Sequence, residues 1–169
     1  SFSSIGLMKK NLINSITESL AITLLLISGI ILLKFIIISF NLIPEYHYLF
    51  APYYTLNFTQ NDTAIYKFSI WFISLIIYAA GAFGQELVIR GGLQTSMQKF
   101  FSFKNKWSAV LLSNLIFSSC HAYLGTIDPF VNFFPGLLWG WMYQRQGNLA
   151  GAIVSHILIG CIILFIIGI

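Results

Sequence analysis

The chain has 169 residues, of which 57% are hydrophobic and only 8% are charged, and its mean hydropathy is +0.83. Several apolar runs are near twenty residues long, the length of a membrane span, so the composition predicts a one-domain integral membrane protein and excludes a sizeable soluble core. Lysines and arginines at the membrane surface account for the net charge of +4, which gives no indication of nucleic-acid binding.

The first predicted span covers residues 20–40. It is longer than the core of a usual signal peptide and no small-residue cleavage pattern follows it, so we expect an anchor. Lys34 interrupts this run, and we expect its side chain to extend toward the interface if it lies near a helix end. The polar and aromatic residues 41–67 predict a surface loop.

Four more spans follow along the chain. The second begins near Phe68 and is expected to kink at the glycine pair Gly91–Gly92, before an amphipathic stretch and a basic linker at 104–106. The others are predicted at residues 107–124, 130–143 and 149–169. The predicted fold class is therefore all-α, a polytopic membrane helix bundle of about five transmembrane helices. Its parts are an anchor helix with an outer loop (1–67) and a helical core (68–169).

The distribution of basic residues predicts the orientation. Five spans place the basic segments on one side of the membrane: Lys9 and Lys10, the linker at 104–106 and the turn at Arg145. The loops on the opposite side are mostly acidic. Positive charge favours the cytosolic side, so we expect a multi-pass protein with a cytosolic N-terminus. Cys120 and Cys161 lie in separate apolar segments and indicate no disulfide.

Four ionisable residues lie in or beside apolar stretches: Glu86, Arg90, His121 and His156. Ionisable groups in hydrocarbon are costly and mark functional sites by default. We expect them to meet in a polar cavity within the membrane. There a carboxylate can deprotonate a water, one imidazole can assist, and another can donate to the oxyanion that forms on a peptide carbonyl.

Other chemistries fit the residues less well. Glu86, His121 and His156 are also a possible zinc ligand set, but the local His-Glu-x-x-His spacing of a readable zinc site is missing, so we expect neither a metal nor another cofactor. A serine protease needs a Gly-x-Ser-x-Gly-like element, which the chain lacks. An aspartyl protease needs two aspartates inside spans, yet Asp62 and Asp128 fall in predicted loops.

Three ordered motifs carry a resemblance to a known family. They are the residues 85–91 (Gln-Glu-Leu-Val-Ile-Arg-Gly), the stretch from Phe117 to His121, and the segment from Arg145 to His156. Together they resemble the CPBP family of intramembrane proteases, which includes the CAAX prenyl endopeptidase and the bacteriocin-processing or self-immunity (Abi) proteins. The resemblance covers about residues 68–169. It implies an all-helical membrane bundle with a conical cavity and glutamate-dependent hydrolysis of a peptide bond.

The resemblance also implies residue roles and a substrate class. Glu86, His121 and His156 are the expected catalytic residues: Glu86 as acid/base, His121 assisting it and His156 at the oxyanion. Gln85, Arg90 and Phe117 are the expected supporting residues. The implied partners are the lipid bilayer and a hydrophobic or lipidated peptide substrate.

Two positions depart from the family pattern. Gln85 aligns with the first glutamate, usually taken as the general base, and Gly160 aligns with the asparagine four residues after the last histidine. A glutamine cannot accept the proton of a water. The alternative is therefore a catalytically impaired pseudoprotease that binds a membrane partner. A small transporter using the same polar groups is a third hypothesis, although no inverted repeat is found.

Each of these residues also has a structural interpretation. Glu86 and Arg90 are spaced for an i,i+4 ion pair. His121 is placed to hydrogen-bond the turn at Gly125, and His156 to bond a backbone carbonyl in the core. The aromatic side chains from Phe133 to Tyr143 are expected to pack and to anchor the chain at the interface. Four glycines are expected to allow close approach of helices: Gly136, Gly140, Gly151 and Gly160.

Overall fold

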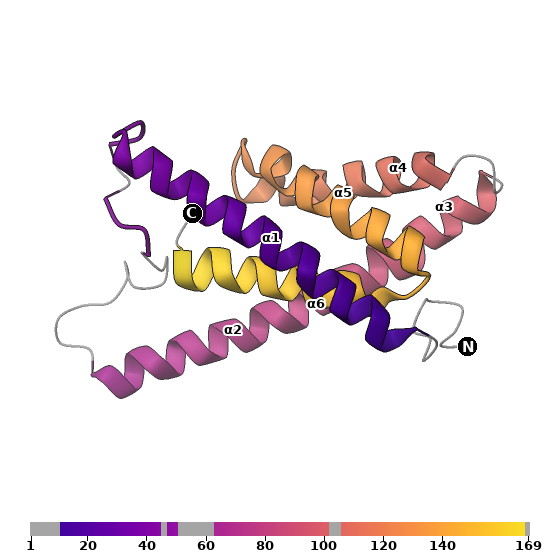
Figure 1. The fold of residues 1–169 in the computed structure, drawn as a ribbon. Coiled ribbons are helices and arrows are strands. Elements are labelled where there is room, and N and C mark those ends of the chain that lie inside the picture. The colour runs from indigo at the N-terminus through magenta and orange to yellow at the C-terminus, as the bar shows by residue number, and fades with distance from the viewer. Residues whose placement is uncertain (1–10, 45–46, 51–62, 102–105, 168–169) are drawn as a thin grey trace. The chain divides into compact units, whose positions relative to one another are not determined.

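The computed structural model of the chain is built from helices, and no strand occurs among the residues that it describes (Figure 1). These are residues 11–44, 47–50, 63–101 and 106–167. The all-α fold class predicted from the sequence is confirmed. The lysines at positions 9 and 10, most of the predicted outer loop and all but the last residue of the basic linker lie outside the described residues.

The helices follow the predicted order. They are α1 (Leu12–Ser39), α2 (Ala64–Glu86), α3 (Thr95–Phe100), α4 (Lys106–Ser119), α5 (Asp128–Gln146) and α6 (Leu149–Ile162). Three segments of other helical types continue them: the π-helical η3 (Leu87–Gln94), the 3₁₀ turn η4 (Cys120–Tyr123) and the π-helical η5 (Ile163–Ile167).

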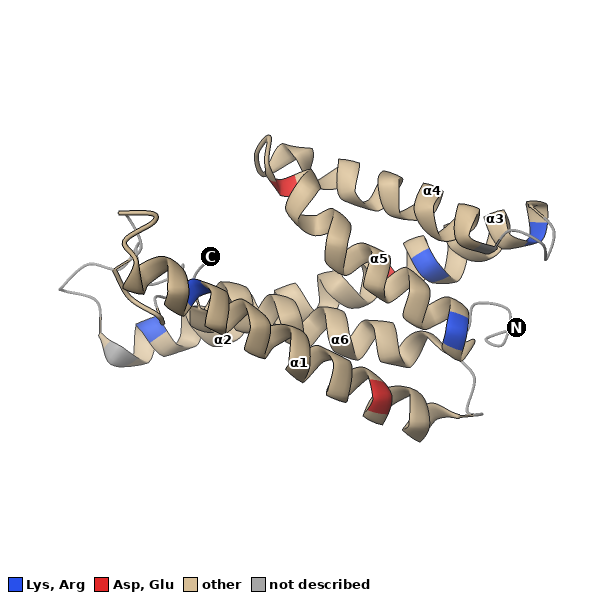
Figure 2. Ribbon diagram, turned by 45° about the horizontal axis from the view of Figure 1, so that its top comes forward, with Lys and Arg blue, Asp and Glu red and all other residues tan. Residues whose placement is uncertain are grey.

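Three helical stretches in the described part are long and apolar enough to cross a membrane: Leu12–Ser39, Ile65–Phe100 and Leu149–Ile167. Such a crossing needs about 20 residues. α4 has 14 residues and α5 has 19, and neither is among the three. Charged residues are sparse along all the helices, which agrees with a multi-pass membrane protein (Figure 2).

Local sequence explains the sharp turn between α5 and α6. Gly147 adopts the left-handed conformation, with φ of 61°, and its N–H donates to the Tyr143 carbonyl at 2.9 Å. Only glycine adopts this conformation at no steric cost, and it commonly ends helices in this way. The Asn148 side chain then accepts a hydrogen bond from the Ala150 N–H at 2.9 Å, which caps the first turn of α6.

The chain divides into two compact units. The first comprises residues 1–20 and 82–156, and the second comprises residues 21–81 and 157–169. In the first unit, α4 packs against α5 around fully buried side chains such as Val110, Met142 and Leu149. The first unit holds all four ionisable residues that the sequence singled out.

The beginning of α1 belongs to the first unit and makes polar contacts there. Glu18 forms an ion pair with Arg145 at 2.9 Å, and the Gln146 amide donates to the Ser19 hydroxyl at 3.3 Å. Gly151 lies against this same Ser19 side chain, so a Cβ at position 151 would collide with it. The expected close approach at Gly151 is therefore confirmed.

The second unit contains a similar close approach between α2 and α6. A Cβ at Gly160 would overlap the hydroxyl and ring of Tyr78, so only glycine fits beside this ring without a shift. The Tyr78 ring also meets Phe165 edge-on, with 6.2 Å between centroids. Lys34 is buried in this unit and donates to the Ile167 carbonyl at the end of η5, so its ammonium group is held inside the protein.

Candidate active site

Glu86 and Arg90 form the predicted pair at the junction of α2 and η3. The Arg90 Nε lies 3.4 Å from the Glu86 Oε2, and both side chains are fully buried. Residues four apart lie on the same face of a helix, and a buried charge requires a partner. The pair therefore neutralises itself in the interior of the first unit.

His156 joins this pair from α6, 70 residues further along the chain. Its Nδ1 lies 2.9 Å from the Glu86 Oε1, and its side chain is nearly buried. An ionised carboxylate only accepts hydrogen bonds, so Nδ1 carries the proton. The structure thus brings Glu86, Arg90 and His156 together, and the Nδ1 of His156 meets a carboxylate rather than the expected backbone carbonyl.

Arg90 also binds the backbone of α5. Its Nη2 donates to the Gly136 carbonyl at 2.8 Å and lies 3.5 Å from the Asn114 Oδ1. Gly136 permits this approach, because a Cβ there would collide with Asn114 and Phe117. Asn114 in turn donates to the Phe133 carbonyl at 2.8 Å. Asn114 was not predicted from the sequence, although an asparagine in the apolar α4 was a detectable signal.

Gln94 repeats the same contact one turn further along. Its Nε2 donates to the Gly140 carbonyl at 2.9 Å, and its side chain is fully buried. Arg90 and Gln94 are four residues apart, as are Gly136 and Gly140. Two polar side chains of η3 therefore bind two backbone carbonyls on one face of α5. The sequence reasoning also missed Gln94.

Aromatic rings enclose the His156 imidazole. The Trp139 ring stacks on it with 3.8 Å between centroids and 13° between planes. Phe117 meets it edge-on at 5.8 Å, and the same Phe117 ring lies 4.7 Å from the His121 ring and 5.1 Å from the Arg90 guanidinium carbon. Phe117, expected as a supporting residue, therefore contacts three of the four predicted ionisable residues.

His121 lies on the 3₁₀ turn η4 and is only part-buried. Its Nδ1 lies 2.9 Å from the backbone carbonyl of Phe117, four residues earlier, rather than reaching the turn at Gly125. A carbonyl only accepts, so Nδ1 carries the proton and the Nε2 of the neutral ring is a proton acceptor.

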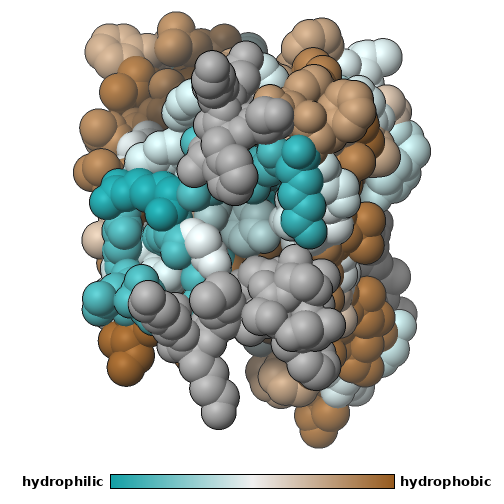
Figure 3. All heavy atoms as spheres, turned by 90° about the vertical axis from the view of Figure 1, so that its right-hand side faces the viewer, coloured by the Kyte–Doolittle hydropathy of each residue, from teal (hydrophilic) through white to brown (hydrophobic). Residues whose placement is uncertain are grey.

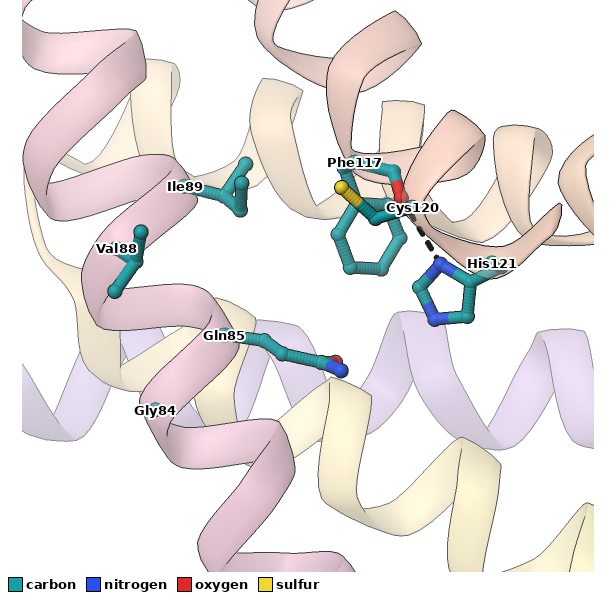
Figure 4. Close-up of a pocket in the computed structure, with 7 residues that line it drawn as sticks. All are labelled: Gly84, Gln85, Val88, Ile89, Phe117, Cys120 and His121. Carbon is teal, nitrogen blue, oxygen red and sulfur yellow. Dashed lines mark hydrogen bonds between the residues drawn. The ribbon is translucent and has the colours of Figure 1, made fainter. Parts of the chain in front are cut away.

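A cavity of about 320 Å³ lies beside this histidine (Figure 4). Its lining is Gly84, Gln85, Val88, Ile89, Phe117, Cys120 and His121. The Gln85 side chain and the His121 ring extend toward the same space (Figure 4). The cavity differs from the expected one, because its wall is largely apolar and Glu86 and His156 are buried outside its lining. Gln85, expected only as a supporting residue, faces the cavity in their place.

The described residues contain no group of three His, Cys, Asp or Glu side chains close enough to hold a metal ion. Glu86 and His156 are in contact, whereas His121 lines the cavity. The zinc alternative therefore lacks the ligand cluster that it requires in this part of the chain. The expectation that no cofactor is used stays a prediction.

Three helical stretches long and apolar enough to cross a membrane define the class as a multi-pass membrane protein, and the first unit holds a buried carboxylate–imidazole pair. The family comparison agrees with it, because the sequence pattern of the type II CAAX prenyl endopeptidase Rce1-like family matches residues 67–162. This match covers more than half of the chain, which therefore belongs to that family, a branch of the CPBP proteases. Neither the curated proteins nor the solved structures gave a match.

Proposed function

We propose that the chain is an intramembrane endopeptidase that hydrolyses a peptide bond in a hydrophobic or lipidated substrate. The observation that carries the proposal is the buried hydrogen bond between Glu86 and His156, which lies in the family's motif positions beside a cavity that holds His121. Family membership supports the reaction type. The apolar cavity wall supports an apolar substrate segment.

In this proposal His121, Gln85 and the Glu86–His156 pair each have a different role. His121 accepts the proton of the attacking water at Nε2, because it is the only ionisable imidazole among the residues that line the cavity. The Gln85 amide cannot accept that proton but can donate to the oxyanion, the role first expected of His156. The protonated His121 then gives that proton to the leaving amine, while Glu86 and His156 form a buried pair behind the wall, where the Phe117 ring contacts both His156 and His121.

Cleavage of a panel of hydrophobic and prenylated peptides in detergent tests the proposal. We expect His121→Ala to lower kcat by about 10²–10⁴-fold, the usual contribution of an acid–base group. Glu86→Gln and His156→Ala are expected to lower it as well. His47→Ala removes the third histidine of the chain, which is exposed, and is the matched control. Full activity in all three site variants would refute the endopeptidase.

A pseudoprotease is the second candidate, and one observation favours it. Gln85 lies in the cavity where the family's glutamate is expected, while the neighbouring Glu86 is fully buried and ion-paired. This candidate predicts binding of a hydrophobic peptide without turnover. Gln85→Glu would then restore cleavage that the wild type lacks, whereas robust wild-type hydrolysis would exclude it.

The proposal includes about five membrane crossings with the N-terminus in the cytosol. α4 with η4, and α5, supply the two crossings beyond the three apolar stretches. In the first unit, hydrophilic side chains gather at the end where α3 and α5 finish and α1 begins (Figure 3). The elements at that end carry Glu18, Lys99 and Arg145. Their basic residues support a cytosolic placement.

A further inference from the structure

Trp139 is the residue in closest ring contact with the Glu86–His156 pair, and the family motifs do not include it. Its ring lies parallel to the His156 imidazole, with 3.8 Å between centroids. Only 2% of Trp139 and 4% of His156 is exposed. One whole face of the imidazole is therefore covered by the indole.

Two contacts fix the indole in turn. Its Nε1 donates to the Ser155 hydroxyl at 3.1 Å, and Phe117 meets its ring edge-on with 5.9 Å between centroids. Ser155 directly precedes His156 in α6. The indole is thus bound to the same helical turn that carries the histidine, and it cannot slide across the imidazole without losing this hydrogen bond.

We propose that Trp139 is a positioning residue for His156: stacking, locked by Ser155, sets the imidazole plane so that Nδ1 faces the Glu86 carboxylate. A histidine ring has broad freedom about χ2, and a flat neighbour restricts that freedom. The Glu86 hydrogen bond at 2.9 Å then fixes the remaining rotation. The kinetic part of this inference rests on the proposed endopeptidase function.

The first test is the NMR spectrum of the protein in micelles, with ¹³C-labelled histidine. The chain has three histidines, and the ring current of Trp139 should move the His156 ring-proton signals upfield of those of exposed His47. We expect the shift to persist, reduced, in Trp139→Phe and to vanish in Trp139→Leu. Trp141→Leu, two residues along α5, is the control and should leave the signal unchanged.

The second test is kinetic. Trp139→Leu should lower kcat roughly two- to ten-fold, the size of one aromatic pair, with KM unchanged because Trp139 does not line the cavity. Trp139→Phe should restore most of kcat. Ser155→Ala keeps the indole ring of Trp139 but removes its hydrogen bond. This variant should broaden the His156 signal and lower kcat less than Trp139→Leu does. It also keeps the test decisive if Trp139→Leu fails to fold.

The NMR test and the kinetic test distinguish the positioning role of Trp139 from the proposed endopeptidase function. An unshifted His156 signal in the wild type, or a shift that survives Trp139→Leu, overturns the positioning role. A lost shift with unchanged kcat also overturns it. If the wild type cleaves no peptide, the proposed function fails, and the chemical shifts alone decide whether Trp139 positions His156.

Discussion

The Glu86 carboxylate neutralises the buried charge of Arg90 and also contacts His156. Within the described part of the chain, the other contacts of the guanidinium are the Gly136 carbonyl, Asn114 and the Phe117 ring, none of which carries a negative charge. Removing the carboxylate would therefore leave a guanidinium charge buried without a counter-charge. The stability of the fold therefore depends on Glu86, which is also one of the residues proposed to act in catalysis.

Glu86→Ala should destabilise the fold by about 3–5 kcal/mol, the usual cost of breaking a buried ion pair. The double variant Glu86→Leu with Arg90→Met should lose less, because it removes both charges together. Gln85→Ala, the adjacent position in the cavity wall, is the control. SDS unfolding of the purified protein measures these differences, and equal stability of Glu86→Ala and Gln85→Ala would contradict the charge-balance argument.

Gly160 gives a second prediction for a single residue. Gly160→Ala should destabilise the protein because the new Cβ overlaps the Tyr78 hydroxyl and ring. Gly29→Ala is the matched control, since no atom lies within 4 Å of the Cβ that it adds, and it should gain roughly 1 kcal/mol from helix propensity. Tyr78→Ala should largely rescue Gly160→Ala. Additive losses in the double variant would show that the two side chains do not compete.

Among the secondary-structure elements, η3 determines how the site is assembled. Eight consecutive residues, Leu87–Gln94, are π-helical, and two of them bind carbonyls of α5. π-helical turns are rare and often occur at functional sites. The wider turn lets Arg90 and Gln94 both face α5 while Glu86 remains on the side of His156.

Gln94→Leu should therefore cost about 1–3 kcal/mol, because the Gly140 carbonyl loses a buried hydrogen bond and the π-helical turn loses an anchor. Gln98→Leu, one turn later on α3, is the control. Its Nε2 is buried without a hydrogen-bond partner in the described part of the chain, so removing it should cost little. Hydrogen exchange of the η3 amides measures the effect locally, and equal protection in both variants would contradict it.

The i,i+4 spacing of Glu86 and Arg90 was enough to predict their pairing, because helix geometry alone fixes that distance. The glycine pair at 91 and 92 predicted a kink, and the structure has a π-helical segment there, a helix type at which kinks are common, so the kink itself stays a prediction. Two side chains of this segment bind carbonyls of α5, 46 residues away, and no local pattern encodes such contacts.

Only part of the site was predicted, because contacts between distant segments are not encoded in local sequence patterns. The meeting of Glu86 with His156 followed from the order of the motifs, and it is confirmed as a contact. Asn114 and Gln94 were missed, and Trp139 was assigned to general packing, because their partners are set by how α5 faces η3 and α6. The catalytic roles of Glu86, His121 and His156, and the division of the chain at residue 67, stay predictions.

For the whole molecule, the proposed topology predicts which residues each side of the membrane exposes. In a variant lacking Cys120 and Cys161, a cysteine introduced at Lys99 or Arg145 should react with a membrane-impermeant maleimide only from the cytosolic side. A cysteine at Ile127, which is 70% exposed in the turn before α5, should react only from the opposite side. Labelling of all three from one side would contradict five crossings.

The contact between Gly160 and Tyr78 also makes the two positions dependent on each other in any redesign of the chain. A side chain at 160 would occupy the space that the tyrosine hydroxyl and ring now fill. A larger residue at 160 therefore fits only after the residue at 78 has become smaller, and the two positions have to be varied together rather than one at a time.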